Sequence, residues 1–390
     1  MHYDFDTVYD RTTNKCLKYD LRKDNFGTDD VLPMWIADMD FKTAPEVIEA
    51  CKARAEEGIW GYTSRPDSYW EALQDWEEKY YGWRPDVDKL SWCMGVVPAF
   101  AALLKINTMP GDKVLVQTPV YMEFRDIPEM IGRRVVCSRM IENEDGTWST
   151  DWEDFEAKAK ECKAFILCNP QNPLGIVWTP EELTRFTQIC MDNNLLMISD
   201  EIHSDLTFHG KKTTRVATLS DEIKNYVVTC TALSKTFNLA GMQCASIIFP
   251  NTKMKRDFDD YWVAMDILRN NAFSVVATET AYREGHGWLA QLKQYVSDNF
   301  DYVNDFCAQN LPQVKPNRPD ATYLMWIDFR GLGMSNEELS EFMIKKAKLG
   351  LSAGWAFDHD LSGFMRMNVA CPRATVEKAM AQLKAAVDEL

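Results

Sequence analysis

The sequence predicts an α/β protein, with a mostly parallel central sheet flanked by helices and a smaller α+β domain beside it. At 390 residues the chain suits one large domain and one smaller domain, each able to bury its own core. From about residue 45 to 285, short apolar runs alternate with longer amphipathic stretches. This alternation is typical of parallel strands joined by helices that cover both faces of a sheet.

Five short apolar runs predict buried strands, at residues 114–116, 164–167, 195–198, 226–228 and 247–249. Helical patterns lie between several of them. The clearest is 180–193, which opens with Thr179 as N-cap, Pro180 at the first helical position and acidic residues in the first turn. Ligands bind beyond the carboxyl ends of parallel strands, so reactive side chains are expected directly after these runs.

The C-terminal part of the chain predicts the smaller domain. A long helical pattern covers residues 254–310, strand patterns follow at 323–329 and 364–369, and helical patterns at 336–348 and 375–389. We expect residues 1–44 to pack with this unit. The predicted division is a large domain of residues 45–285 and a small domain of residues 1–44 and 286–390.

The composition excludes several classes of partner. The net charge is −16, and the field of such a surface repels both phosphate backbones and anionic lipids. No apolar run approaches the ~18 residues of a membrane span. Eleven cysteines without Cys-x-x-Cys spacing, and a start without a secretion signal, indicate a cytoplasmic protein with reduced thiols. The five histidines form no metal-ligand motif.

Lys235 lies in the segment Ser-Lys-Thr-Phe-Asn, after the apolar run that ends near Cys230. Burial lowers the pKa of a lysine amine, which makes it a nucleophile that can form a Schiff base with an aldehyde at neutral pH. A lysine at a strand end is, taken alone, more often a solvated surface charge. The chemical interpretation therefore depends on the other polar residues that follow the predicted strands.

Two such residues are Asp200 and Asn172. An unpaired carboxylate at the end of a buried strand is costly, so Asp200 calls for a cationic partner such as a protonated pyridine nitrogen. The alternative for Asp200 is an N-cap of a following helix. Asn172 lies in the segment 169–175, Asn-Pro-Gln-Asn-Pro-Leu-Gly, whose prolines hold the residues before them extended. Such a loop can aim the Asn172 amide as a donor, although a rigid turn alone also explains it.

Three further features predict contacts with anions or with a ring. The N–H groups of Val96 and Val97 lie between Gly95 and a proline at the start of a predicted helix, which is a ready anion site. Arg366 lies inside an apolar run, where an unpaired guanidinium is expensive and a carboxylate suits its fork geometry. Tyr121 could stack on a cofactor ring, although most tyrosines are core or surface residues.

Together these residues resemble the fold-type-I, aspartate-aminotransferase-like enzymes, which depend on pyridoxal 5'-phosphate (PLP), over nearly the whole chain. The resemblance rests on Tyr121, the Asn-Pro-x-Asn-Pro-x-Gly segment, Asp200 with His203, Ser234 with Lys235, and Arg366. The fold that it implies is PLP fold type I, with a mostly parallel central sheet flanked by helices plus a smaller α+β domain.

Within that superfamily the chain is most similar to the MalY/PatB group of carbon–sulfur β-lyases, which includes cystathionine β-lyases and cysteine desulfhydrases. Segments 32–41 (Leu-Pro-Met-Trp-Ile-Ala-Asp-Met-Asp-Phe), 60–62 and 199–205 carry this finer resemblance. Gln243 stands where many aminotransferases have a phosphate-binding arginine, which the lyase group also lacks. Gln171 and Leu174 depart from the histidine and threonine common in relatives.

The resemblance implies a role for each residue. Lys235 is the Schiff-base lysine and the proton-transfer base, Asp200 pairs with the pyridine nitrogen, and Tyr121 stacks on the ring. Asn172 contacts the cofactor 3-oxygen and the substrate. The remaining expected contacts are a phosphate site made by Val96, Val97, Ser234 and Thr231, with Tyr62 from a second subunit, His203 near the 3-oxygen, and Arg366 on the substrate carboxylate. For His203, packing against a helix is the alternative.

The expected function is a PLP-dependent C–S β-lyase that releases thiol, pyruvate and ammonia from sulfur amino acids. An aminotransferase is the first alternative, because the shared residues serve both reactions. A regulatory or interaction protein that keeps the fold is the second, and the intact set of site residues argues against it. The role of Tyr62 requires a second chain, so a homodimer is expected.

Overall fold

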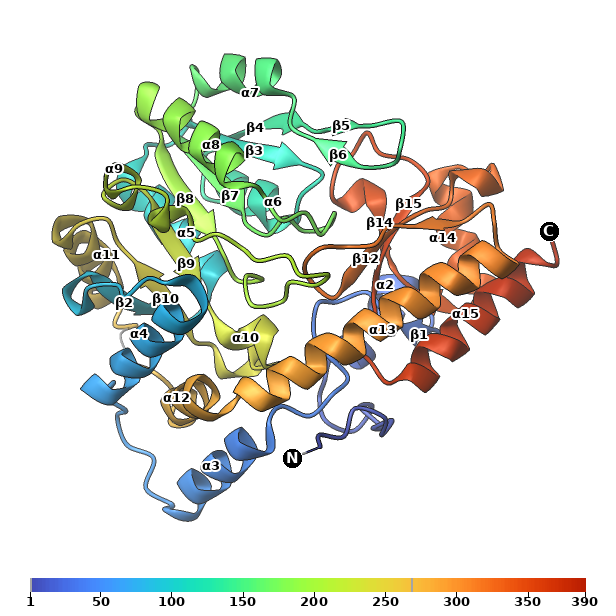
Figure 1. Ribbon diagram of the computed structural model, residues 1–390, viewed down its shortest axis with the longest axis horizontal. Helices are drawn as coiled ribbons and strands as arrows, with labels where there is room; N and C mark the ends of the chain where they lie inside the picture. The colour runs from blue at the N-terminus through green and yellow to red at the C-terminus, as the bar shows by residue number, and fades with distance from the viewer. Residues whose placement is uncertain (1, 268) are drawn as a thin grey trace.

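The computed structural model describes residues 2–267 and 269–390. Its centre is a seven-stranded sheet, shown in Figure 1. The strand order is β2 (Leu90–Cys93), β10 (Ala245–Ile248), β9 (Val228–Thr231), β8 (Leu196–Asp200), β7 (Ala164–Cys168), β3 (Lys113–Thr118) and β4 (Arg134–Arg139). From β9 to β4 every pair is parallel, whereas β10 runs antiparallel to both of its neighbours. The predicted mostly parallel sheet is confirmed.

The register of the parallel strands brings their carboxyl ends to one edge of the sheet. Cys168 at the end of β7 is opposite Asp200 at the end of β8, and Asp200 is opposite Cys230 in β9. The loops that follow these strands therefore start side by side. Asn172 and Lys235 lie on two of those loops, four and five residues beyond the aligned positions.

Helices cover both faces of the sheet, because alternate residues of each strand point to opposite faces. Val116 of β3 belongs to the same hydrophobic cluster as Phe100, and Leu115 to the same cluster as Phe186. One cluster includes residues of α5 (Val96–Asn107), α6 (Glu123–Met130) and α11 (Thr252–Ala264). The other includes residues of α7 (Trp152–Ala159), α8 (Pro180–Asp192) and α9 (Asp221–Lys224). The predicted N-cap of α8 at Thr179 is confirmed, and the structure adds a capping box between Thr179 and Glu182.

A second, antiparallel sheet belongs to the C-terminal part of the chain. Its strand order is β11 (Lys315–Pro316), β12 (Leu324–Asp328), β15 (Phe364–Asn368) and β14 (Ser352–Ala353). The long helices beside it in Figure 1 are α13 (His286–Asn310) and α15 (Arg373–Val387), with α14 (Asn336–Lys345) nearby. Strand β1 (Leu32–Pro33) pairs with β13 (Leu349–Gly350), which joins the N-terminal segment to this unit. The bounds of the two domains stay a prediction.

The remaining α-helices and strands are short or lie at the periphery. They are α1 (Leu17–Asp20), α2 (Arg22–Phe26), α3 (Pro45–Glu56), α4 (Asp67–Tyr81), α10 (Leu233–Thr236), α12 (Ser274–Glu284), and a small hairpin of β5 (Ile141–Glu142) and β6 (Trp148–Ser149).

The prediction of one helical stretch over residues 254–310 is wrong, because three helices occupy it. Asp266 adopts a left-handed backbone with φ +54° just after α11, and the side chain of Asn271 accepts the backbone N–H of Ser274 where α12 begins. Gly285 separates α12 from α13, and a Cβ there would lie 2.3 Å from the ring of Phe237. Close packing at this point therefore requires glycine.

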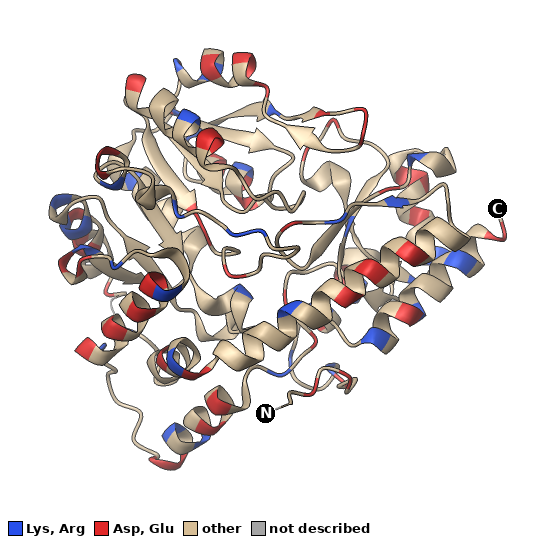
Figure 2. Ribbon diagram, viewed as in Figure 1, with Lys and Arg blue, Asp and Glu red and all other residues tan. Residues whose placement is uncertain are grey.

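Charged residues lie mainly on the helices and loops, and the central strands carry few of them (Figure 2). Among the described residues, no helix combines the length and the apolar character that crossing a membrane demands. Within the same residues, no group of three or more His, Cys, Asp and Glu side chains is placed to hold a metal ion.

Candidate active site

A cavity of about 410 Å³ lies at the carboxyl edge of the central sheet. It is lined by nine of the eleven residues predicted from the sequence, which are Val96, Val97, Tyr121, Asn172, Asp200, His203, Ser234, Lys235 and Arg366. They come from loops that follow four strands, from the start of α5 and from β15 of the second sheet. The fold thus brings together residues that are up to 270 positions apart in the chain, from Val96 to Arg366.

Lys235 lies in the short helix α10, which follows β9. Its Nζ donates a hydrogen bond to the backbone oxygen of Ala37 at 2.7 Å. Burial, and next the nearby charge of Arg366, lower the pKa of Lys235 to about 8. A large fraction of this amine is therefore neutral near pH 8, as a nucleophile or a base requires.

Asp200 is buried at the end of β8. Its Oδ1 accepts the backbone N–H of Ile202 at 3.1 Å, and burial raises the pKa of the carboxyl to about 7. A turn rather than a helix follows it, so Asp200 does not act as a helix N-cap. A cation placed against this carboxylate would relieve the cost of burying its charge.

The loop at 169–175 is braced from two sides. Gln171 donates through Nε2 to the backbone oxygen of Pro119 at 2.5 Å and accepts the N–H of Leu174 at 2.9 Å, while the Leu174 side chain is buried in the core. At Gly175, φ is +72° and a Cβ would lie 2.4 Å from Pro319, so only glycine fits. The two departures from the family pattern therefore act as supports of the loop that carries Asn172.

Arg366 lies in β15 and is almost fully buried. Its Nη1 donates to Asn172 Oδ1 at 3.0 Å and its Nη2 to the oxygen of Trp35 at 2.9 Å, whereas its Nε has no partner among the described residues. Burial lowers the pKa of this guanidinium to about 10. A buried cation whose protein partners are all uncharged is a suitable receptor for a ligand carboxylate.

His203 is buried beside these two cations. Burial, and next the charges of Lys235 and Arg366, hold the pKa of the imidazole well below its usual range, so the ring is neutral. Its Nδ1 lacks a hydrogen-bond partner within the part of the chain that the structure describes. His203 lines the cavity, which favours a ligand contact over the alternative of helix packing.

Tyr121 borders the same cavity. Burial, and next the charge of Glu123, raise the pKa of its phenol to about 12, so the hydroxyl stays neutral. The backbone N–H of Tyr121 donates to the oxygen of Asn172 at 3.1 Å, which ties the two loops together. Stacking of the Tyr121 ring on a cofactor stays a prediction.

The N-terminus of α5 lies at one end of the cavity, and its free N–H groups suit an anion. The helix begins at Val96, two residues earlier than the predicted start at Pro98. The N–H groups of Val96 and Val97 belong to the first turn, where the helix itself supplies no acceptor. Ser234 and Gln243 line the cavity as well. A phosphate bound there would meet neutral donors, since the only Lys and Arg side chains in the lining are Lys235 and Arg366.

Two predicted residues lie outside this cavity. The hydroxyl of Thr231 accepts from Arg215 Nη2 at 3.5 Å, within a buried polar network. Tyr62 is 91% exposed, and the guanidinium of Arg269 lies over its ring at 4.8 Å from the ring centroid. A contact between Tyr62 and an active site therefore requires another chain.

Sequence reasoning missed the backbone acceptors of the site. Trp35 and Ala37 line the cavity through a segment quoted above only for its family resemblance. Asn368 holds that segment by donating to the oxygens of Ile36 at 2.7 Å and Asp38 at 2.6 Å. A signal for Asn368 was present, because it is an amide two residues after Arg366 in the same buried strand.

The chain belongs to the aminotransferase class I and II family, whose pattern matches residues 29–383. It is 38% identical to cystathionine β-lyase PatB of Bacillus subtilis (strain 168) over 385 residues, which cover 98% of this chain and 99% of that protein. These values show that the family resemblance extends over the whole fold.

Two solved structures are similar at the level of the fold. Cystalysin from Treponema denticola, which contains pyridoxal 5'-phosphate, has a TM-score of 0.96 and 32% identity, and the match covers 100% of both chains. A PLP-bound protein from Clostridium difficile 630, provisionally described as an aminotransferase, has a TM-score of 0.97 and 40% identity, with 99% of this chain and 100% of that chain covered.

Proposed function

We propose that this protein is a PLP-dependent carbon–sulfur β-lyase, which releases thiol, pyruvate and ammonia from sulfur amino acids. One observation carries the proposal. Lys235, Asp200 and Arg366 line a single cavity, Asp200 and Arg366 are buried and Lys235 is half-buried, and none of the three has an ion-pair partner of opposite charge among the described residues. Together they require a ligand set that brings a cation to Asp200 and an anion to Arg366.

The residues present fit PLP. The buried carboxylate of Asp200 suits the protonated pyridine nitrogen, and the unpaired Nδ1 of His203 and the amide of Asn172 suit the 3-oxygen. The first-turn N–H groups of Val96 and Val97, with the Ser234 hydroxyl, suit the phosphate. Thr231 completes the predicted set, although its hydroxyl lies near Arg215.

When bound, PLP supplies an aldehyde for amine capture and a cationic ring that stabilises negative charge at the substrate α carbon. The protein has three tasks in the reaction. Arg366 holds the substrate carboxylate, Asp200 keeps the ring nitrogen protonated, and Lys235 removes the proton from the α carbon through Nζ. The lowered pKa of Lys235 suits the last task, because a neutral amine is the base.

The relatives support sulfur amino acids as the substrate class. PatB is named a cystathionine β-lyase, and 38% identity over nearly the full length is a strong likeness. Gln243 at the phosphate end agrees, because the lyase group lacks the arginine that many aminotransferases have there. Cleavage of L-cystathionine by water would give homocysteine, pyruvate and ammonia.

An aminotransferase is the second candidate, which the description of the Clostridium difficile protein favours. Every side chain assigned above would serve that reaction too, because both reactions begin with loss of the α proton. They differ in what leaves: a thiol in the lyase, and an amino group passed to a keto acid in the aminotransferase.

A homodimer completes the proposal. Ile59, Trp60 and Tyr62 are 80%, 62% and 91% exposed on one short segment, which is unusual for large apolar side chains. Contact with a second chain would cover them and bring Tyr62 to the partner's phosphate site. All eleven cysteines are free, which supports a reducing, cytoplasmic location.

The deciding experiment incubates the purified holoenzyme with L-cystathionine and no keto acid, and measures pyruvate and free thiol. The lyase predicts equal amounts of both products, and their absence from the Lys235→Ala variant. Absence of both products from the wild type, together with amino transfer to an added keto acid, would favour the aminotransferase instead.

A further inference from the structure

Residues 35–39 form a strap that borders the cavity through Trp35, Ile36 and Ala37 and contacts both of its cations. The oxygen of Trp35 accepts from Arg366 at 2.9 Å, and the oxygen of Ala37 accepts from Lys235 at 2.7 Å and from the hydroxyl of Tyr323 at 2.9 Å. The strap belongs to no helix or strand, so its position depends on these contacts and on its side chains.

Two asparagines fix the ends of the strap. Asn368, two residues after Arg366, donates to the oxygens of Ile36 and Asp38. Asn238, three residues after Lys235, accepts the N–H of Met39 at 3.0 Å and donates back to the oxygen of Met39 at 3.0 Å. The strap is thus tied to neighbours of both functional cations, one in β15 and one just after α10.

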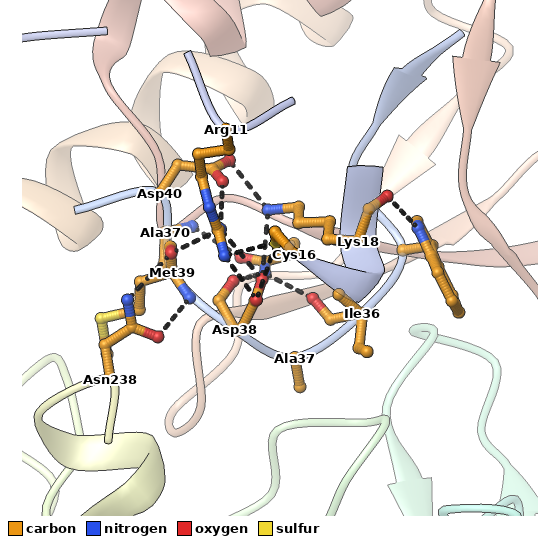
Figure 3. A network of polar contacts seen from close by, with 12 residues as sticks. Arg11, Cys16, Lys18, Ile36, Ala37, Asp38, Met39, Asp40, Asn238 and Ala370 are labelled. Atoms are coloured by element: carbon orange, nitrogen blue, oxygen red, sulfur yellow. Dashed lines mark hydrogen bonds and ion pairs between the residues drawn. The ribbon is translucent and has the colours of Figure 1, made fainter. Parts of the chain in front are cut away.

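A partly buried cluster of charges anchors the same segment from the N-terminal side (Figure 3). Arg11 contacts Asp38 Oδ2 at 2.8 Å through Nη2 and Asp40 Oδ1 at 2.6 Å through Nη1. Lys18, whose side chain is 1% exposed, contacts Asp40 Oδ2 at 2.8 Å. Arg11 also donates to the oxygen of Met39 at 2.9 Å. Two cations from one short segment thus hold two carboxylates of another.

The charges of this cluster are mutually dependent. Asp38 and Asp40 both contact Nη1 of Arg11, at 3.3 and 2.6 Å, so their carboxylates lie close enough to repel each other. Arg11 and Lys18 offset that repulsion. Removal of one cation leaves both carboxylates facing the single cation that remains, so their mutual repulsion is no longer fully offset, and Asp38 moves toward water and takes the strap with it.

We propose that Arg11 and Lys18 are positioning residues, which hold the strap so that its backbone frames the substrate-carboxylate site at Arg366. This inference rests on the proposed role of Arg366 as the carboxylate clamp. The groups assigned to the cofactor come from the central sheet and its loops, and no hydrogen bond or ion pair among the described residues joins them to Arg11 or Lys18, although one of them, Lys235, donates a hydrogen bond to the strap at the oxygen of Ala37. Displacement of the strap is therefore expected to weaken substrate binding, while the cofactor contacts that the central sheet makes remain.

The test compares Arg11→Met and Lys18→Met with Arg11→Lys, which keeps the charge, and with Lys52→Met. Lys52 pairs with Glu49 on the surface of α3 and serves as the matched control. Calorimetry measures the Kd of the holoenzyme for 3-(methylthio)propionate, a carboxylate without an amino group. Cofactor absorbance reports occupancy of the PLP site, and steady-state kinetics give KM and kcat separately.

We expect Kd and KM to rise about tenfold or more in both Met variants, with kcat within about threefold and cofactor absorbance unchanged. Arg11→Lys should recover most of the affinity, and Lys52→Met should match the wild type. Unchanged Kd in folded Met variants would overturn the inference, as would loss of the cofactor together with the carboxylate.

Two further measurements keep the test decisive. If the Met variants fail to fold, Asp38→Asn replaces them, because it removes one charge of the cluster without changing its shape, and the same rise in Kd is expected. Because the Kd is measured without turnover, it does not depend on which reaction the enzyme catalyses. Failure of the lyase assignment would appear in the wild type as missing pyruvate, whereas failure of this inference would appear as variants that bind the carboxylate like the wild type.

Discussion

Arg366 and Asn172 are joined by a hydrogen bond of 3.0 Å, although 194 positions separate them in the chain. The bond links β15 of the antiparallel sheet with the loop after β7 of the central sheet. It engages the Oδ1 atom of Asn172, and no hydrogen bond of the described residues engages Nδ2. The amide is therefore oriented with its donor available, as the predicted contact with the cofactor 3-oxygen demands.

Replacement of Arg366 by Met should separate function from stability. Loss of the guanidinium removes the carboxylate clamp, so the Kd for 3-(methylthio)propionate should rise about 100-fold or more, or ~3 kcal/mol. The cofactor-free protein should become more stable by ~1 kcal/mol or more, because a buried cation without a carboxylate partner is replaced by an apolar side chain. Denaturant unfolding and calorimetry check the two effects.

The control for this prediction is Arg318→Met, which changes an arginine that is 57% exposed and paired with Asp301. It should leave both quantities near the wild-type values. A fall in the stability of Arg366→Met would mean that the hydrogen bonds of the guanidinium outweigh the cost of burying its charge.

Asp200 should give the cofactor-free protein a characteristic pH profile. Its folded-state pKa of about 7 lies above the ordinary value of 3.8, so the folded state holds a proton that the unfolded state has released between these pH values. Stability therefore falls as the pH rises through that window, and the full cost is present above about pH 7. The side chain of the Asp200→Asn variant does not titrate. The free energy of unfolding of this variant should therefore exceed that of the wild type by an amount that grows from pH 4 to 7 and reaches roughly a few kcal/mol at pH 8.

Denaturant unfolding at pH 4.5, 6 and 8 measures this difference, with Asp192→Asn as the exposed control. The same Asp200→Asn variant should lose most of its lyase activity, because the ring nitrogen of PLP would lack its carboxylate. Parallel stability profiles for Asp200→Asn and the wild type would show that burial of Asp200 carries no such cost.

Tyr62 should act on the partner's active site. Tyr62→Ala and Lys235→Ala homodimers are each expected to be weakly active or inactive, for different reasons. In a hybrid dimer, one site combines Lys235 from the first variant with Tyr62 from the second. Mixing equal amounts after subunit exchange should therefore restore activity to about a quarter of the wild-type level.

Tyr80→Phe, at a tyrosine that is 39% exposed and bonded to His286, is the control and should behave like the wild type. Activity of the mixture that stays at the average of the two variants, in a preparation shown by sedimentation to contain hybrids, would mean that Tyr62 serves no site across the interface.

Glu77 should be important for folding rather than for chemistry. Its carboxylate pairs with Arg215 at 2.6 Å, Arg215 also pairs with Glu201 at 3.1 Å, and all three side chains are at most 1% exposed. Removal of Glu77 leaves Arg215 partly uncompensated in the core, which is expected to cost about 3–5 kcal/mol. Denaturant unfolding of Glu77→Ala tests this, and Glu71→Ala on the exposed face of the same helix should change little.

The sequence predicted the sheet well because buried parallel strands are short, apolar and regularly spaced. It overestimated the helix at 254–310, since the left-handed turn at Asp266 and the contact of Gly285 with Phe237 depend on tertiary packing. Hydrophobic periodicity continues through such breaks and does not report them.

The side chains of the site were predictable because each carries chemistry that is expensive to bury. Arg366 and Asp200 are charged residues inside apolar runs. Burial of such a charge costs free energy unless a partner offsets it, so each of them indicates a ligand. The strap was not predictable in the same way, since its contribution is made by backbone oxygens at Trp35 and Ala37, whose positions follow from the fold and from distant anchors. Every residue has a backbone carbonyl, so the sequence does not indicate which of them will face a cavity.

The antiparallel strand β10 has a consequence for how the site tolerates change. Because β10 runs back beside β9, its beginning lies at the same edge as the end of β9, and the thirteen-residue connection between Thr231 and Ala245 carries both Lys235 and Gln243. The connection between β9 and β10 thus fixes the position of the Lys235 amine and also supplies Gln243 to the phosphate end of the cavity. An insertion or deletion within this connection would shift both the Lys235 amine and the phosphate end. A point substitution at Gln243, in contrast, can alter the phosphate end without moving Lys235.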